Sequence, residues 1–98
     1  MNLRVTFHTD AEQELYEAAG YYNAETPGLG NSFLDDVEHA IGQLVQYPES
    51  APLVNKLVRR KPLRRFPYNV MYTVLPDAIR IVAVANQKRR PFYWRGRM

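Results

Sequence analysis

Two segments that lie far apart in the sequence concentrate cationic side chains, five between positions 59 and 65 and five between positions 88 and 97. They are Arg59, Arg60, Lys61, Arg64 and Arg65, and then Lys88, Arg89, Arg90, Arg95 and Arg97. Guanidinium and ammonium groups bind phosphates and carboxylates through charge-assisted hydrogen bonds. Arginine stays protonated and is a poor base, and a lysine becomes a base only where burial or neighbouring cations lower its pKa. The two segments therefore predict anion binding more directly than proton transfer.

Charge is distributed unevenly along the 98 residues. Residues 1–50 contain nine acids and one base, a net charge of −8, whereas residues 51–98 contain one acid and twelve bases, a net charge of +11. Such asymmetry indicates a polyanionic partner for the second half, either nucleic-acid phosphates or an acidic protein tail. The alternatives are that the two halves attract each other within the fold, or that the cations form a solvated face.

Three aromatic residues, Phe92, Tyr93 and Trp94, lie within the second cationic segment. They are positioned to stack on the bases of a nucleic acid. The alternative is that they anchor the C-terminus onto the rest of the protein, and Trp94 is the one expected to be purely structural.

Composition is typical of a globular protein, with 46% hydrophobic residues, and we expect residues 1–98 to form one domain. The apolar runs are far shorter than the ~20 residues of a membrane span, and the N-terminus lacks the apolar stretch of a signal peptide. The chain has no cysteine, which excludes disulfides and thiol chemistry and suits the cytoplasm. His8 and His39 lack metal-ligand spacing, so neither a metal nor a cofactor is expected.

The first part of the chain predicts a strand and a helix. Residues 3–7 alternate between apolar and polar side chains, as a strand does. A helix start is expected near Thr9, because Thr9 and Glu12 match a capping box. Apolar residues recur at helical spacing until the Pro/Gly break at 27–30, and the glutamates among them are expected to lie largely on the solvent side.

A second helix is expected to begin within residues 28–32 and to end by residues 47–48, where a proline follows a tyrosine. Asp35 and Asp36 lie in its first turns. We expect both carboxylates to be solvated and to complement the positive end of the helix dipole.

The second half of the chain predicts three strands, at 56–63, 68–74 and 79–85. Pro62 interrupts the first, which indicates an edge position or a bend. The middle one alternates with period two, and the last is apolar at nearly every position except Arg80, as expected for a strand buried on both faces.

The order β-α-α-β-β-β predicts an α+β fold. We expect a mainly antiparallel four-stranded sheet with the helical hairpin packed on one face and the last three strands in a meander. In antiparallel neighbours the start of one strand adjoins the end of the next. The two cationic segments are therefore expected to meet at one end of the sheet and to form a shared anion-binding surface.

Three stretches of the sequence resemble the RelE/ParE family of toxins from bacterial type II toxin–antitoxin pairs. They are YYNAETPGLGNSFLDDVEHAI (21–41), RRFPYNVMYTV (64–74) and IVAVANQKRRPFYWRGR (81–97), and the likeness covers essentially the whole chain. The resemblance implies a small sheet domain with a helical hairpin, neutralised by a cognate antitoxin that wraps it. The resemblance does not fix the target, because some members resemble ribosome-dependent ribonucleases that cut mRNA, others resemble poisons of DNA gyrase, and many have no known target.

Several positions distinguish the two kinds of member. In the ribonuclease-like pattern an arginine follows the strand tyrosine, and here Asn69 follows Tyr68. That pattern also has a lysine–arginine pair after the last strand, where this chain has Asn86 and Gln87. Only the terminal tyrosine is kept, as Tyr93. The resemblance is therefore greater to the gyrase-poison side.

The sequence predicts a toxin that inhibits growth by binding an essential target, with DNA gyrase as the preferred one. The residues expected to bind the target are Arg59, Arg60, Arg64, Arg65, Lys88, Arg89, Arg90, Tyr93, Trp94 and Arg95. One alternative is a metal-independent, ribosome-dependent mRNA endoribonuclease, whose catalytic residues would be Lys61, Arg65, Arg89 and Tyr93. Another is a degenerate, non-toxic binding module.

Overall fold

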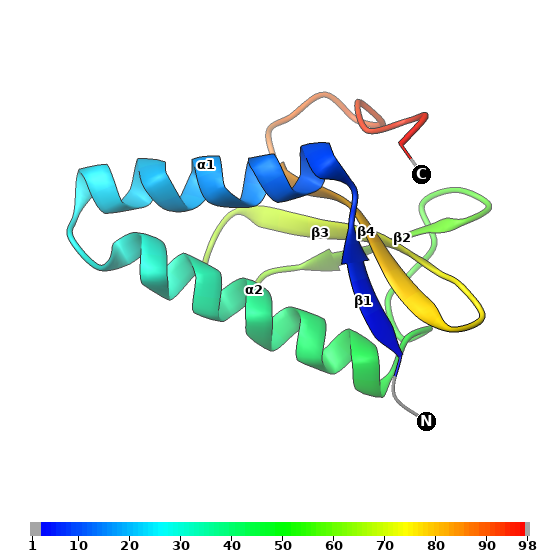
Figure 1. Ribbon diagram of the computed structural model, residues 1–98. Helices are drawn as coiled ribbons and strands as arrows, with labels where there is room; N and C mark the ends of the chain where they lie inside the picture. The colour runs from blue at the N-terminus through cyan, green and yellow to red at the C-terminus, as the bar shows by residue number, and fades with distance from the viewer. Residues whose placement is uncertain (1–2, 98) are drawn as a thin grey trace.

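A computed structural model describes residues 3–97 and contains the predicted elements in the predicted order (Figure 1). They are β1 (Arg4–Phe7), α1 (Thr9–Glu25), α2 (Leu29–Gln46), β2 (Val58–Pro62), β3 (Tyr68–Val74) and β4 (Ala78–Asn86). Neither helix within residues 3–97 has the length and apolar character needed to cross a membrane.

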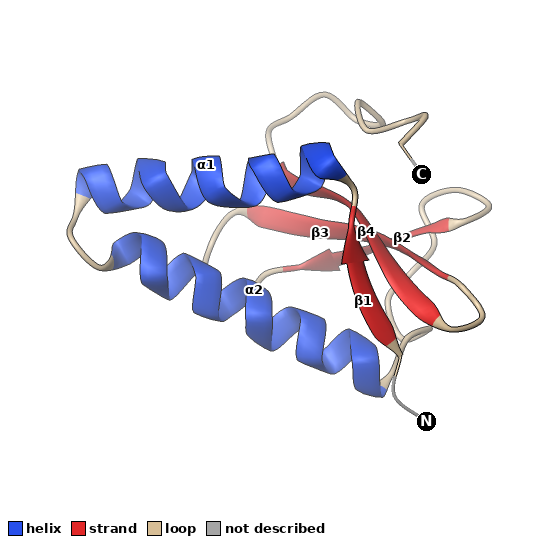
Figure 2. Cartoon of the chain, in the orientation of Figure 1, coloured by secondary structure: helices blue, strands red, loops and turns tan. Residues whose placement is uncertain are grey.

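The four strands form one sheet in the order β1-β4-β3-β2 (Figure 2). β2, β3 and β4 form the expected antiparallel meander, whereas β1 pairs in parallel with β4, with Val5 opposite Ile79. The prediction of an α+β fold with a mainly antiparallel sheet is confirmed, and the β1–β4 pair makes the sheet mixed. The parallel pair arises because the helical hairpin carries the chain to the far edge, β2, and the meander then returns it beside β1. Pro62 ends the edge strand β2, as its missing N–H requires.

Both helices lie on one face of the sheet, as predicted (Figure 1). The main core lies between the helices and the sheet. Residues of β3 and β4 contribute to this core, among them Val70, Tyr72, Ile79, Ile81 and Val84, and an irregularity in the β3–β4 register shifts the alternation between Ile81 and Val84. They meet apolar side chains of α1 and α2, which are Ala11, Leu15, Ala18, Ala19, Phe33, Val37, Ala40 and Leu44.

A second, smaller cluster covers the opposite face of the sheet. It joins Val58 of β2, Met71 of β3 and three residues of β4, and Trp94 from the C-terminal tail packs against them. This cluster explains why β4 is apolar on both faces, because the tail shields the face that the helices leave open. The prediction of a last strand buried on both faces is thus confirmed.

The N-terminus of α1 lies where predicted, but Thr9 is not its cap. His8 is the cap residue, and its Nδ1 accepts a hydrogen bond from the Asp10 backbone N–H at 3.0 Å. The Glu12 backbone N–H donates to the His8 carbonyl at 3.0 Å. The capping-box interpretation of Thr9 and Glu12 was therefore wrong by one residue, because an imidazole nitrogen can satisfy a helix N–H as a hydroxyl does.

Candidate functional site

The strand register brings the end of the first cationic segment and the start of the second to the same end of the sheet. Lys61 near the end of β2 lies opposite Val70, and Tyr68 at the start of β3 lies opposite Asn86 at the end of β4. The β2–β3 loop, with Arg64 and Arg65, and the residues after β4 therefore leave the sheet side by side. This is the juxtaposition that the sequence predicted.

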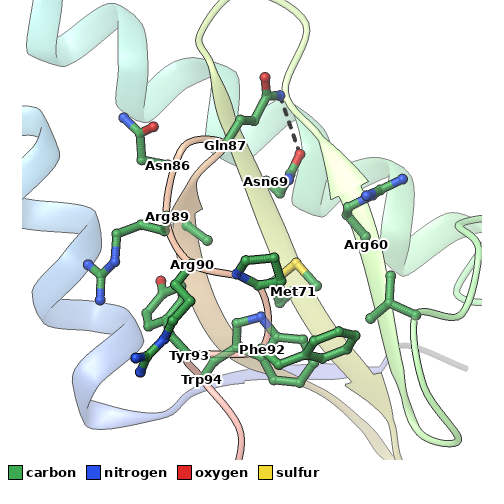
Figure 3. Close-up of a pocket in the computed structure, with 13 residues that line it drawn as sticks. Arg60, Asn69, Met71, Asn86, Gln87, Arg89, Arg90, Phe92, Tyr93 and Trp94 are labelled. Atoms are coloured by element: carbon green, nitrogen blue, oxygen red, sulfur yellow. Dashed lines mark hydrogen bonds between the residues drawn. The ribbon is translucent and has the colours of Figure 1, made fainter.

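A hollow of about 230 Å³ lies between these segments (Figure 3). Arg60 on β2 flanks one side, and Arg89 and Arg90, after β4, flank the other. None of the described residues that line it carries a carboxylate. We call it the basic hollow, and its remaining lining residues are Val54, Asn69, Met71, Ala85, Asn86, Gln87, Pro91, Phe92, Tyr93 and Trp94. Three arginines, together with apolar lining side chains, suit an anionic partner with some apolar surface.

Two neutral amides in the hollow bind each other. The Gln87 side-chain N–H donates to Asn69 Oδ1 at 3.4 Å, drawn as the dashed line in Figure 3. Asn86 is also engaged locally, since its Oδ1 accepts from the Lys88 backbone N–H at 2.9 Å. The amides thus contribute dipoles but no charge where the ribonuclease-like pattern has cations.

Tyr93 is directed toward α1. Its hydroxyl donates a hydrogen bond to Glu14 Oε2 at 2.8 Å, and the Arg89 guanidinium lies over its ring, 3.8 Å from the centroid. Burial raises the pKa of the Tyr93 phenol well above its ordinary value, and the hydrogen bond to Glu14 and the charge of Glu14 raise it further, against the opposing effect of Arg89 and Arg97. The phenol therefore stays protonated and bound to a carboxylate.

Other predicted site residues are placed differently. Arg59 lies outside the hollow, because its guanidinium donates to the carbonyls of Glu49 and Ala51, at 3.0 and 2.7 Å. Trp94 is only 5% exposed, so its ring anchors the tail and is not presented for stacking. Arg95 is exposed and lies over the Phe92 ring. The remaining cations at this end of the sheet do not line the hollow: Arg64, Arg65 and Lys88 are exposed, and Lys61 is partly exposed.

Comparison with known proteins identifies the family. The family described as the ParE toxin of the type II toxin–antitoxin system parDE matches residues 5–91. The chain belongs to the ParE toxin family. It is 34% identical over 95 residues to proteins named Toxin ParE2 from two strains of Mycobacterium tuberculosis, covering 93% of this chain and 88% of each relative.

A solved structure shares the fold of this ParE-family toxin. A chain of the chromosomal ParDE TA system from P. aeruginosa superposes with a TM-score of 0.75, over 86% of this chain and 95% of that one. The two chains are 18% identical in sequence, so the likeness shows the fold alone. It agrees with the α+β fold expected from the order of elements and with the architecture that the RelE/ParE resemblance implies.

Sequence reasoning missed two carboxylates that organise the site of the toxin. Glu14, expected on the solvent side of α1, has a side chain only 15% exposed and binds the tail. Asp36, expected to be solvated, is 5% exposed, and its Oδ2 accepts from the Arg65 backbone N–H at 2.9 Å. Both lie next to the apolar stripe of their helix, beside Leu15 and Val37, and that border position was the available signal.

Removal of the Asp36 carboxylate should loosen the cationic β2–β3 loop. We expect Asp36→Ala to lower the free energy of unfolding by about 2 kcal/mol, because the Arg65 N–H loses a charged acceptor. Urea unfolding followed by circular dichroism measures the change. Asp35→Ala is the matched control, since Asp35 is exposed on the same helix, and it should stay within about 0.5 kcal/mol of wild type. Equal effects of the two substitutions would contradict a specific role for Asp36.

Proposed function

We propose that this ParE-family toxin inhibits growth by binding DNA gyrase through the basic hollow and the cations beside it. The family and the relatives named Toxin ParE2 support a toxin. The arrangement of the site supports binding, because three arginines and no described carboxylate line the cavity. Gyrase is a cytoplasmic enzyme, so the proposed site of action is the cytoplasm.

The observation that carries the choice of binding over RNA cleavage is the state of Tyr93. RNA cleavage needs a base for the 2′-hydroxyl, an acid for the leaving oxygen and cations for the phosphate. The Tyr93 hydroxyl donates instead to Glu14, and its pKa is raised. The amides Asn69 and Gln87 bind each other where a ribonuclease-like member would have cationic groups. These residues favour a surface that recognises its target without cutting it.

A cognate antitoxin is the second proposed partner. The exposed cations around the hollow, Arg60, Arg64, Arg65, Lys88 and Arg90, offer a positive surface to an acidic antitoxin segment. Complementary charge of this kind speeds association and disfavours wrong partners. An antitoxin bound there would cover the surface that the toxin uses against its target, which would neutralise it.

Two assays on purified toxin test the proposed target. We expect the toxin to inhibit supercoiling by gyrase and to leave mRNA uncut on purified ribosomes. Codon-specific cuts that disappear in Tyr93→Phe would establish the ribonuclease alternative. Gyrase that is neither inhibited nor bound would refute the proposed target.

An assay in cells tests the toxic role itself. We expect expression of the chain to arrest growth, and co-expression of the antitoxin encoded beside it to relieve the arrest. Unimpaired growth at verified expression of folded protein would favour the degenerate, non-toxic alternative.

A further inference from the structure

The C-terminal segment, residues 91–97, forms a wall of the basic hollow. Pro91, Phe92, Tyr93 and Trp94 all line the cavity. The segment contains no helix or strand, and it runs back across the sheet toward the start of α1 (Figure 1). Its position therefore depends more on side-chain contacts than on the backbone hydrogen bonds of a helix or strand.

Glu14 supplies several of these contacts from α1. One carboxylate oxygen accepts hydrogen bonds from the Val84 backbone N–H and from Arg97 Nη1, both at 3.0 Å. The other accepts from the Tyr93 hydroxyl at 2.8 Å and from Arg97 Nη2 at 3.2 Å. Arg97 also donates to the Val82 carbonyl at 3.1 Å. One carboxylate thus joins α1, β4 and two residues of the C-terminal segment.

The segment is held in a conformation that it would not adopt on its own. Phe92 has a φ of 62°, in the left-handed region that a bulky residue rarely occupies. Such backbone strain persists only where the surrounding structure fixes the chain. The contacts of Tyr93 and Arg97 with Glu14, together with burial of Trp94, fix it here.

We propose that Glu14 is a positioning residue for the target-binding hollow, acting through Tyr93 and Arg97. It does not line the cavity, yet it fixes the ring on which the Arg89 guanidinium rests and the backbone that carries Phe92. Without the carboxylate, Arg97 loses its closer and less exposed countercharge and retains Asp10, whose Oδ2 lies 3.8 Å from Arg97 Nε and whose side chain is 56% exposed. Loss of the closer partner in a largely buried place favours release of the segment. The inference rests on the proposed function, because it assigns Glu14 a role in that same site.

The tryptophan of the chain reports directly on this segment. Trp94 is the one tryptophan in the sequence and is buried against the sheet, so its fluorescence follows docking of the segment. We expect Glu14→Gln to increase the quenching of Trp94 by acrylamide and to shift its emission to longer wavelength, while far-UV circular dichroism stays unchanged. The pKa of Tyr93 should fall toward its ordinary value, because the neighbouring negative charge is gone.

Growth arrest on expression provides a functional readout that does not depend on which target is correct. Loss of charge-assisted hydrogen bonds predicts that Glu14→Gln needs about tenfold more toxin to arrest growth. Glu17→Gln is the matched control on the same helix, since Glu17 is exposed, and it should match wild type in both assays. Arg97→Gln removes the partner of Glu14 in the ion pair and should reproduce the effect of Glu14→Gln. It replaces Glu14→Gln as the test if the Glu14 variant fails to fold.

The outcomes separate this inference from the proposed function. Unchanged Trp94 quenching in both Glu14→Gln and Arg97→Gln would overturn it, as would a released Trp94 with undiminished growth arrest. A wild-type toxin that arrests growth without inhibiting gyrase would refute the proposed target, while the Glu14 variants would still decide the positioning role.

Discussion

Gly30→Ala is expected to lower the free energy of unfolding by about 3 kcal/mol, the upper part of the usual range for overpacking. Gly30 lies at the start of α2, close to the backbone of α1, and its backbone N–H donates to Asn23 Oδ1 at 2.8 Å. A Cβ at this position would collide with the Ala19 carbonyl of α1 and with the Asn23 side chain. The carbonyl belongs to a helix backbone that cannot yield locally, so the two helices must separate and part of the core between them must open.

Thermal unfolding measures this effect, and a second glycine of the same helix provides the control. For a domain of this size about 3 kcal/mol corresponds to a fall in Tm of roughly 12–24 °C. Gly42 lies in α2 with nothing within 4 Å of a Cβ, so Gly42→Ala should instead stabilise the protein, by about 0.5–1 kcal/mol. A Gly30→Ala variant as stable as wild type would show that the hairpin relaxes without cost.

Periodicity was sufficient to predict the elements of this fold, because each element buries one face. Period 3.6 located α1 and α2, and the nearly continuous apolar run of β4 correctly indicated burial on both faces. The parallel partner of β1 was not predictable in this way. The partner of β1 depends on where the helical hairpin and the meander lead the chain. The local alternation of apolar and polar residues does not determine that path.

The candidate site was predictable in outline and not in its internal contacts. Strand adjacency placed the cationic segments together, but in a strand successive side chains point to opposite faces. From the sequence alone, that rule would have placed Arg59 and Arg60 on opposite faces of the sheet. Glu14 and Asp36 could not be assigned partners, because those partners lie 70 and 29 residues away, at Val84 and Arg65. Helical period places a side chain at the border of a face and does not say which loop it meets.

Removal of guanidinium groups from the basic hollow is expected to weaken target inhibition without unfolding the toxin. Arg60 and Arg90 both line the cavity, and within residues 3–97 neither guanidinium has a hydrogen bond or an ion pair. Their substitution therefore leaves no buried group unpaired. Arginines at the centre of an interface commonly contribute about 2 kcal/mol or more to binding, so each single Arg→Ala change should weaken inhibition by more than about tenfold.

The control for this prediction is a cation at the other end of the sheet. Arg4 is exposed and pairs only weakly with the exposed Asp77, so Arg4→Ala removes the same charge away from the hollow. Inhibition of supercoiling by the Arg60→Ala, Arg90→Ala and Arg4→Ala proteins should separate the first two from the third. Equal loss in all three would mean that inhibition follows net charge and not this surface. Because exposed charges are screened by salt, the difference between Arg60→Ala and wild type should also narrow as ionic strength rises.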